Sequence, residues 1–161
     1  MHHCFAPVTR PDCRILILGS LPGAASLAAQ RYYAHPQNQF WRLIGAVIDR
    51  DLVPLPYEDR LTALLEARVG LWDTVATATR KGSLDADIRL HEVSDLAALT
   101  ATLHALKAVG FNGATAARIG RAQLAAVSAP TLLDLPSSSP AYASLPFAAK
   151  RDAWLALRTY L

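Results

Sequence analysis

The side chains best suited to chemistry gather near the start of the chain, between Gly19 and Trp41. Five polar or aromatic residues of this stretch fall within seven positions: Tyr32, Tyr33, His35, Gln37 and Asn38. The amide of Asn38 offers both a hydrogen-bond donor and an acceptor, so it can orient a water molecule without becoming charged. We therefore place the candidate active site in this stretch.

A buried strand leads into this stretch. Residues 14–18 form a short, nearly continuous apolar run that ends at Gly19. Such runs suit a parallel strand that is covered on both faces. In open α/β sheets, ligands bind beyond the carboxyl ends of the strands. A loop that leaves the first strand with glycine, serine and proline is therefore a good candidate for the binding crevice.

The remaining apolar patterns predict an α/β protein. Strands are expected at residues 14–18, 69–72, 106–111 and 130–135, and helices at 39–48, 57–67, 96–105, 114–126 and 147–160. Strands that alternate with helices indicate an α/β sandwich with a mainly parallel, four-stranded sheet. Residues 73–89 are mostly polar, and we expect them to form a long connection of the kind that is often functional.

Polar loops follow each expected strand, at residues 19–38, 73–88, 112–113 and 136–142. The carboxyl ends of parallel strands meet at one edge of a sheet, so these loops are expected to share that edge. The third strand is the weakest step of this inference, because Lys107 and Gly110 interrupt its apolar run.

The composition describes one globular domain, residues 1–161. Hydrophobic residues make up 52% of the chain and charged residues 18%, which excludes a disordered tail. No apolar run approaches the about 20 residues that span a bilayer, and the amino terminus has no signal-peptide pattern. We therefore expect a cytoplasmic protein with no membrane partner.

Metal and cofactor chemistry is not expected. Two cysteines cannot supply the four thiolates of an iron–sulfur cluster. The histidines at positions 35, 91 and 104 show no metal-ligand spacing, so we expect no metal. The net charge of +3 and the pI near 9.1 permit a polyanionic partner, although no run of lysine or arginine requires one.

Several motifs in chain order resemble the uracil-DNA glycosylase superfamily. They are Gly19-Ser20-Leu21-Pro22-Gly23, Tyr33-Ala34-His35-Pro36-Gln37-Asn38-Gln39-Phe40-Trp41, Phe111-Asn112-Gly113 and Leu135-Pro136-Ser137-Ser138-Ser139-Pro140-Ala141. The branch that they resemble most is that of the hypoxanthine-DNA (deoxyinosine) glycosylases, which is related to the mismatch-specific uracil and thymine glycosylases. Two shorter motifs also resemble this branch, so the similarity covers nearly the whole chain: Leu71-Trp72-Asp73 and Gly82-Ser83-Leu84-Asp85.

The resemblance implies a three-layer α/β/α fold and a monofunctional DNA glycosylase of base excision repair. Such an enzyme flips a deaminated base, here chiefly hypoxanthine, out of double-stranded DNA and hydrolyses its N-glycosidic bond. That bond breaks by charge separation, so the site needs donors to the base and a placed water, and we expect no cofactor. Single-stranded DNA is a further candidate partner, and we expect a monomer. A uracil or mismatch glycosylase and a non-catalytic module that binds damaged DNA are the alternatives.

Asn38 is the residue that the resemblance favours as catalytic, through the water that it positions. Mismatch-specific relatives carry a further asparagine at the position of Leu21, and a leucine cannot place a water. This departure shifts the water-binding role toward Asn38. The structural alternative is that Asn38 only caps the helix expected to begin near Gln39.

The resemblance also implies contacts to the base. Tyr33 aligns with the aromatic residue that stacks on the flipped base. Asn112 can hydrogen-bond the polar edge of a purine, unless Asn112-Gly113 is only a turn. His35 can touch phosphate or the base, although a lone histidine before proline is more often structural. The first loop supplies the other expected substrate contacts: Gly19, Ser20, Leu21 and Pro22.

DNA contacts are expected from the loop after the last strand. Its hydroxyls can position phosphates, although three serines between prolines also form an ordinary turn. Tyr142 stands where the family has a smaller polar residue, in a loop whose counterpart wedges into the duplex. The expected phosphate contacts are Ser137, Ser138, Ser139 and Lys81, the last of which is equally plain surface. Asp73, Asp85 and Asp87 can act as bases or serve as caps and solvated charge.

Overall fold

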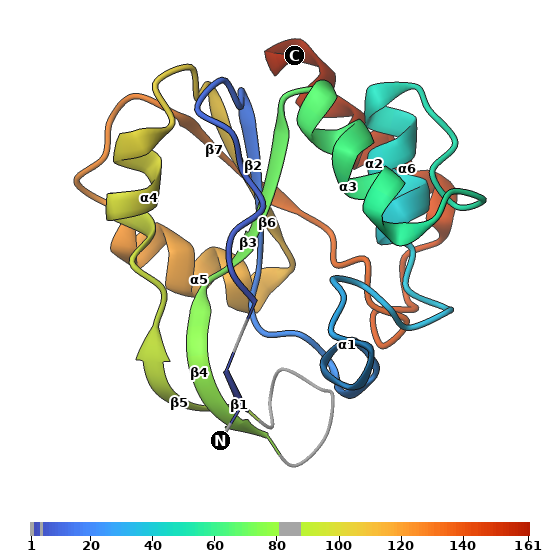
Figure 1. Cartoon of the computed structure of the whole chain (residues 1–161), viewed down its shortest axis with the longest axis horizontal. Coiled ribbons are helices and arrows are strands. Elements are labelled where there is room, and N and C mark those ends of the chain that lie inside the picture. Colours follow the sequence, from blue (N-terminus) through green and yellow to red (C-terminus); the bar gives the residue numbers. More distant parts are fainter. Residues whose placement is uncertain (1, 4, 81–87) are drawn as a thin grey trace.

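A parallel sheet at the centre of the molecule positions the other elements (Figure 1). The computed structural model describes residues 2–3, 5–80 and 88–161. The main sheet has the strand order β3-β2-β6-β7, and each neighbouring pair is parallel. Its strands are β2 (Ile15–Gly19), β3 (Val69–Asp73), β6 (Ala108–Asn112) and β7 (Thr131–Leu135). The four expected strands are therefore confirmed, with small shifts of their bounds.

Both faces of strand β2 are buried, which explains its continuous apolar sequence. Ile15 and Ile17 belong to one hydrophobic core, whereas Leu16 and Leu18 belong to a second one. Successive side chains of a strand point to opposite faces of its sheet. A parallel strand that is covered on both sides therefore needs an apolar residue at every position.

Helices cover the two faces of the sheet and complete a three-layer α/β/α sandwich (Figure 1). One face carries α2 (Phe40–Ile48), α3 (Tyr57–Glu66) and α6 (Phe147–Trp154), and the other carries α4 (Leu96–Thr102) and α5 (Ala114–Gln123). The predicted fold class is confirmed. After α6 the chain continues as a 3-10 helix (Leu155–Tyr160). None of the described helices has the length and apolar character needed to cross a membrane.

A second, antiparallel sheet occupies much of the region expected to be a long polar connection. Strands β4 (Val75–Arg80) and β5 (Ile88–Val93) pair with each other, and β1 (His2–His3) pairs with β4. The expectation was wrong because it considered the polarity of the segment and not the alternation of its side chains. Positions 75, 77 and 79 are β-branched, which is a strand signal. Lys81, Asp85 and Asp87 lie outside the described residues.

A short helix that the sequence did not predict, α1 (Ala24–Ala29), lies within the stretch between β2 and α2. Its Ser26 is buried, and the Ser26 hydroxyl accepts a hydrogen bond from the backbone N–H of Ala34 at 2.9 Å. The chain therefore folds back after α1, which returns the polar and aromatic residues 32–38 to the edge of the sheet.

The turn from β6 into α5 requires glycine. Gly113 has a φ of 98°, and a Cβ at this position would lie 3.3 Å from the Cβ of Ser137. The Gly113 N–H donates to the carbonyl of Leu135 at 3.1 Å. The ends of β6 and β7 are therefore joined, and Asn112 lies beside the loop that follows β7.

Gly120 allows α5 to pack against the sheet, because a Cβ at this position would collide with the buried ring of Phe111. We expect Gly120→Ala to lower the free energy of unfolding by about 1–3 kcal/mol, as overpacking does. This outcome opposes helix propensity, which favours alanine over glycine by about 1 kcal/mol. Urea unfolding measures the difference. Ala122→Gly, at an exposed position of the same helix, measures the propensity effect alone, and a more stable Gly120→Ala protein would contradict the packing argument.

Candidate active site

A cavity of about 570 Å³ lies at the carboxyl edge of the parallel sheet. This volume is within the about 300–1,000 Å³ usual for small-molecule sites. Residues at or just after the ends of β2, β3, β6 and β7 contribute to the lining. It includes these predicted site residues: Gly19, Ser20, Leu21, Pro22, Tyr33, His35, Asn38, Asn112, Ser137, Ser138 and Ser139. The remaining one, Lys81, lies outside the described residues.

The Tyr33 ring forms a fixed aromatic surface of the cavity. It stacks on Phe40 with a centroid distance of 3.9 Å and meets Trp41 edge-on at 6.5 Å. The Trp41 indole N–H donates to the Tyr33 carbonyl at 3.2 Å. The Tyr33 backbone has a φ of 53°, a left-handed conformation that costs a residue with a side chain about 1–3 kcal/mol. These contacts hold the backbone there and fix the ring at the cavity.

Asn38 lies one residue before Gln39, the N-cap of α2. Its side-chain oxygen Oδ1 accepts a hydrogen bond from the Phe40 N–H at 2.9 Å, so the predicted contact with the start of the helix is present. An amide oxygen has two lone pairs, and this bond uses one of them. Helix capping and water binding therefore do not exclude each other, because the Phe40 N–H fixes an amide that can still accept from a water.

Asn112 holds the loop after β7. Its Nδ2 donates to the Ser138 hydroxyl at 2.8 Å, and its Oδ1 accepts from the Ser138 N–H at 2.9 Å. A longer contact of 3.4 Å joins Nδ2 to the Tyr33 hydroxyl. The Ser138 carbonyl in turn accepts from the Gln39 N–H at 3.0 Å. We call these contacts among Asn112, Ser138 and Gln39 the loop clamp; it joins the end of β6, the loop after β7 and the start of α2.

The three predicted serines differ in their surroundings. Ser138 is 1% exposed and belongs to the loop clamp, so its side chain faces the protein. Ser137 and Ser139 are half-buried, and their hydroxyls accept from the N–H groups of Ser139 and Ala141, each at 3.1 Å. A hydroxyl that accepts in this way keeps its own O–H as a donor. Ser137 and Ser139 are therefore better placed than Ser138 to donate to an anion.

His35 and Leu21 line the cavity in different ways. The Nδ1 atom of exposed His35 accepts from the Gln37 N–H at 3.1 Å, so the neutral imidazole carries its proton on Nε2. Leu21 is buried in a small apolar cluster with Val75 and Ile119. The leucine thus gives this side of the cavity an apolar surface.

Asp73 is a cavity residue to which the sequence assigned no single role. It is the last residue of β3, pairs in register with Gly19 and is 3% exposed. A Cβ on Gly19 would lie 2.9 Å from Asp73 Oδ1 and 3.1 Å from the Tyr33 hydroxyl oxygen. Both oxygens therefore crowd Gly19, which explains the need for glycine there. Its position at the end of a predicted strand was the signal that could have identified Asp73.

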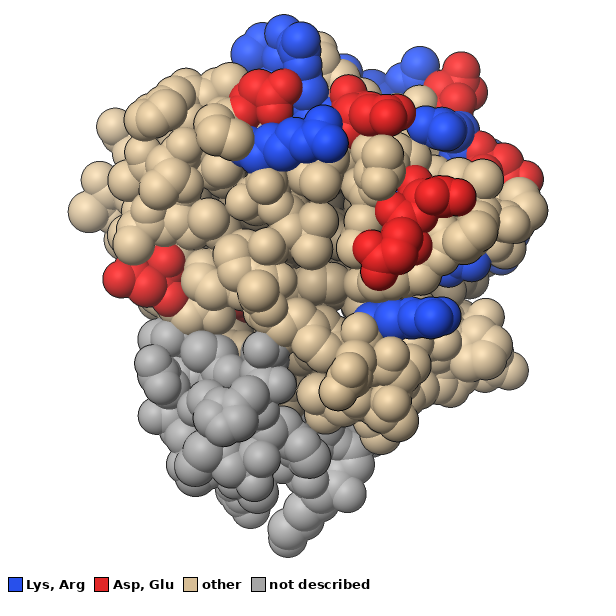
Figure 2. Space-filling view, viewed as in Figure 1, with Lys and Arg blue, Asp and Glu red and all other residues tan. Residues whose placement is uncertain are grey.

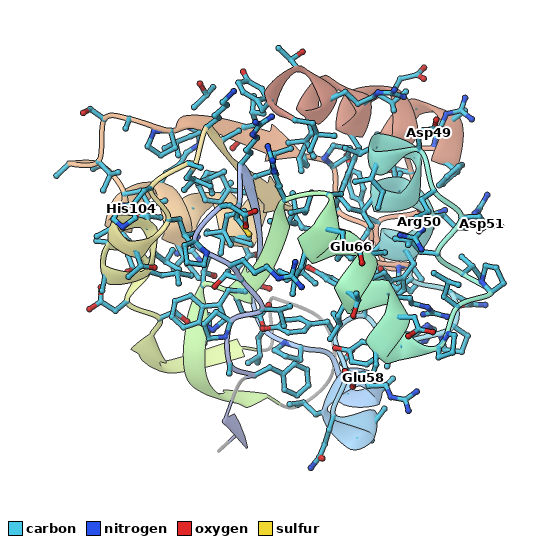
Figure 3. All side chains as sticks on the ribbon, turned by 45° about the horizontal axis from the view of Figure 1, so that its top comes forward. Asp49, Arg50, Asp51, Glu58, Glu66 and His104 are labelled. Carbon is cyan, nitrogen blue, oxygen red and sulfur yellow. The ribbon has the colours of Figure 1, made fainter. Side chains whose placement is uncertain are left out.

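The titratable side chains labelled in Figure 3 do not line the cavity. Figure 3 shows Asp49, Arg50, Asp51, Glu58 and Glu66 on the side of α2 and α3, and His104 on the side of α4. In Figure 2 the surface over α1 is mostly uncharged. The described residues contain no group of three or more His, Cys, Asp or Glu that could hold a metal ion. The polar groups at the cavity are amides, hydroxyls, a histidine and the Asp73 carboxylate.

The chain is thus a parallel α/β/α sandwich protein with a cavity at the carboxyl edge of its sheet. Comparison with known sequences gives its family. The family model of the Uracil DNA glycosylase superfamily matches residues 6–158. The chain therefore belongs to the uracil DNA glycosylase superfamily.

Two relatives and one solved structure show which members of the superfamily the chain is similar to. The chain is 43% identical over 109 residues to a hypoxanthine DNA glycosylase of Methanosarcina barkeri, an alignment that covers 68% of this chain and 69% of the relative. It is 40% identical over 109 residues, with the same two coverages, to a hypoxanthine DNA glycosylase of Methanosarcina acetivorans. Among solved structures, it resembles the solution NMR structure of a candidate uracil DNA glycosylase from Methanosarcina acetivorans. The TM-score is 0.86 and the sequence identity 35%, over 97% of this chain and 95% of the other.

Replacing Asn112 tests the loop clamp. We expect Asn112→Ala to lower the free energy of unfolding by about 1–3 kcal/mol, because it leaves buried groups of Ser138 without partners. Asn112→Asp keeps an acceptor for the Ser138 N–H and can accept from the Ser138 hydroxyl, so it should lose less. Urea unfolding of the two variants measures both effects. Unchanged stability of Asn112→Ala would mean that the clamp does not hold the loop.

Proposed function

We propose that residues 1–161 form a monofunctional DNA glycosylase that flips a deaminated base, chiefly hypoxanthine, out of DNA and hydrolyses its N-glycosidic bond in base excision repair. The cavity is the observation that carries the proposal, because it brings the Asn38 amide, the Tyr33 ring and the Asp73 carboxylate together at one edge of the sheet. Membership of the superfamily and the names of the two Methanosarcina relatives support the same function.

The flipped base binds in the cavity. A base inside the duplex stack is out of reach of the enzyme, and weak pairing lowers the cost of extruding a deaminated one. The Tyr33 ring, stacked on Phe40 and fixed by Trp41, offers a planar surface for the extruded ring. The family resemblance implies a contact between Asn112 and the base. The amide is already oriented by Ser138, so it meets the base in a preset direction.

Hydrolysis uses charge separation, because the electron pair of the C1′–N bond leaves with the base and the sugar becomes cationic. Asn38 positions the water whose oxygen bonds to C1′, and the released proton ends on the departing base. The Asp73 carboxylate stabilises the cationic sugar as it forms, since a fixed charge in a buried site acts without reorganising. These roles need neither a covalent intermediate nor a cofactor.

DNA binding completes the proposal. The substrate is double-stranded DNA that contains a damaged base, with single-stranded DNA as a further substrate form. Ser137, Ser139, His35 and Lys81 contact the phosphates or the flipped nucleotide, and Ser138 supports them from inside the loop. We further propose that the enzyme acts as a cytoplasmic monomer without a membrane partner.

Substrate choice is the direct test of the proposed function. The assay is single-turnover cleavage of labelled duplexes that contain one hypoxanthine or one uracil, followed by alkali to cut the abasic site. We expect faster release of hypoxanthine, since the apolar surface of Leu21 lacks the amide found in mismatch-specific relatives. Release of uracil alone would make the protein a uracil glycosylase. Release of neither base, with tight binding of the damaged duplex, would indicate a binding module.

Substitutions at Asn38 separate its contact with the helix from its contact with water. We expect Asn38→Ala to reduce the single-turnover rate by roughly 10²–10³-fold, the range for the loss of one preorganised hydrogen-bonding group, with DNA binding retained. It should also lower the free energy of unfolding by about 0.5–2 kcal/mol, as loss of a helix-capping contact does. The rate assay and urea unfolding measure these changes.

Asn38→Ser is the matched control, because a serine hydroxyl can still accept from the Phe40 N–H. We expect this variant to regain stability while its turnover stays low. Recovery of the rate together with the stability would show that Asn38 serves only the helix.

A further inference from the structure

Lys150 is buried in a position that is unfavourable for a cation. It lies in the first turns of α6 and is 2% exposed. The amino end of a helix carries partial positive charge, which repels an ammonium group. Burial lowers the pKa of Lys150, since the charged form loses solvation. A buried charge is normally paired, so a lysine in this place needs a partner.

The partner of Lys150 within the described residues is an aromatic ring. The Lys150 Nζ lies 5.2 Å from the centroid of the Tyr142 ring, within the range of a cation–π contact. No described residue forms an ion pair or a hydrogen bond with the Lys150 ammonium. Among the described residues, the Tyr142 ring is therefore the group that offsets the unfavourable burial of the ammonium.

Tyr142 lies at the edge of the cavity and is 43% exposed. Its backbone N–H donates to the Ser139 carbonyl at 3.0 Å, so the ring is carried by the same loop that the clamp holds. An exposed aromatic ring beside a pocket for a flipped base can stack on DNA bases, and such stacking tolerates every base. A duplex from which one base has been extruded has a gap in its base stack, where such a ring can stack on a neighbouring base.

We propose that Lys150 is a positioning residue for DNA binding: its ammonium holds the Tyr142 ring at the mouth of the cavity, where the exposed side of the ring stacks on a base of the opened duplex. The proposal rests on the proposed function. It also accounts for an aromatic residue at position 142, where the family resemblance led us to expect a smaller polar one.

The test measures binding of an uncleavable duplex that contains a tetrahydrofuran abasic site, and of the same oligonucleotide as a single strand. We expect Tyr142→Leu to weaken duplex binding roughly tenfold, within the range of a lost stacking contact, and to change single-strand binding much less. Tyr142→Phe keeps the ring and should retain most of the affinity. Equal losses for the duplex and the single strand, or no loss in Tyr142→Leu, would overturn the stacking role.

Lys150→Met removes the charge and keeps much of the side-chain volume. We expect it to weaken duplex binding several-fold by itself and to add less than twofold when Tyr142→Leu is already present. The salt dependence of binding should keep its slope, because the ammonium acts through the ring and not on a phosphate. Additive losses in the double variant, or a slope reduced by about one counterion, would overturn the positioning role.

Arg151→Met is the matched control, since it removes a charge from the next, exposed position of α6. Its effect should be additive with Tyr142→Leu, and coupling as large as that of Lys150→Met would contradict a specific contact. Lys150→Gln replaces Lys150→Met if thermal unfolding shows that the methionine variant does not fold. Binding of the abasic duplex requires no turnover, so it reports on Tyr142 even if neither hypoxanthine nor uracil is released. The failure of this inference is thereby distinguishable from failure of the proposed function.

Discussion

The loop clamp among Asn112, Ser138 and Gln39 is the interaction on which the rest of the site depends. Ser138 uses its N–H, its hydroxyl and its carbonyl to reach Asn112 and Gln39. Buried polar groups are stable only when their partners are present, so this exchange has one favourable geometry. The geometry fixes the end of β6, the loop after β7 and the start of α2 relative to one another, although these segments are far apart in the sequence.

The hydrophobic core supplies the second constraint on the site. Phe40 is fully buried in the core and stacks on Tyr33, while Trp154 donates from α6 to the carbonyl of Pro136 at 2.9 Å. The same packing that covers the sheet therefore holds the left-handed backbone of Tyr33 and the start of the serine loop. Strained backbone of this kind persists where the surrounding structure determines it, and it is common at functional sites.

The sequence predicted the parallel sheet and its main helices because both depend on local apolar patterns, as in β2 and α2. It also placed the polar loops at one edge, since that follows from parallel topology. The contacts that determine how each side chain is held were not predictable from the sequence. Asn112 and Ser138 are 26 residues apart, and no periodicity links them. Nothing in the sequence marks Lys150 as buried, and only the packing of α6 shows that it is.

The electrostatics of the cavity match a reaction that separates charge. The amino ends of α2 and α5 lie at the carboxyl edge, with Asn38 just before α2 and Thr115 of α5 in the cavity lining. Helix amino ends carry partial positive charge and favour an anion, as a departing base requires. In the proposed reaction, the Asp73 carboxylate at the end of β3 provides the opposite sign for the cationic sugar. Because parallel strands deliver helix starts and strand ends to the same edge, both signs are fixed by the fold before the substrate binds.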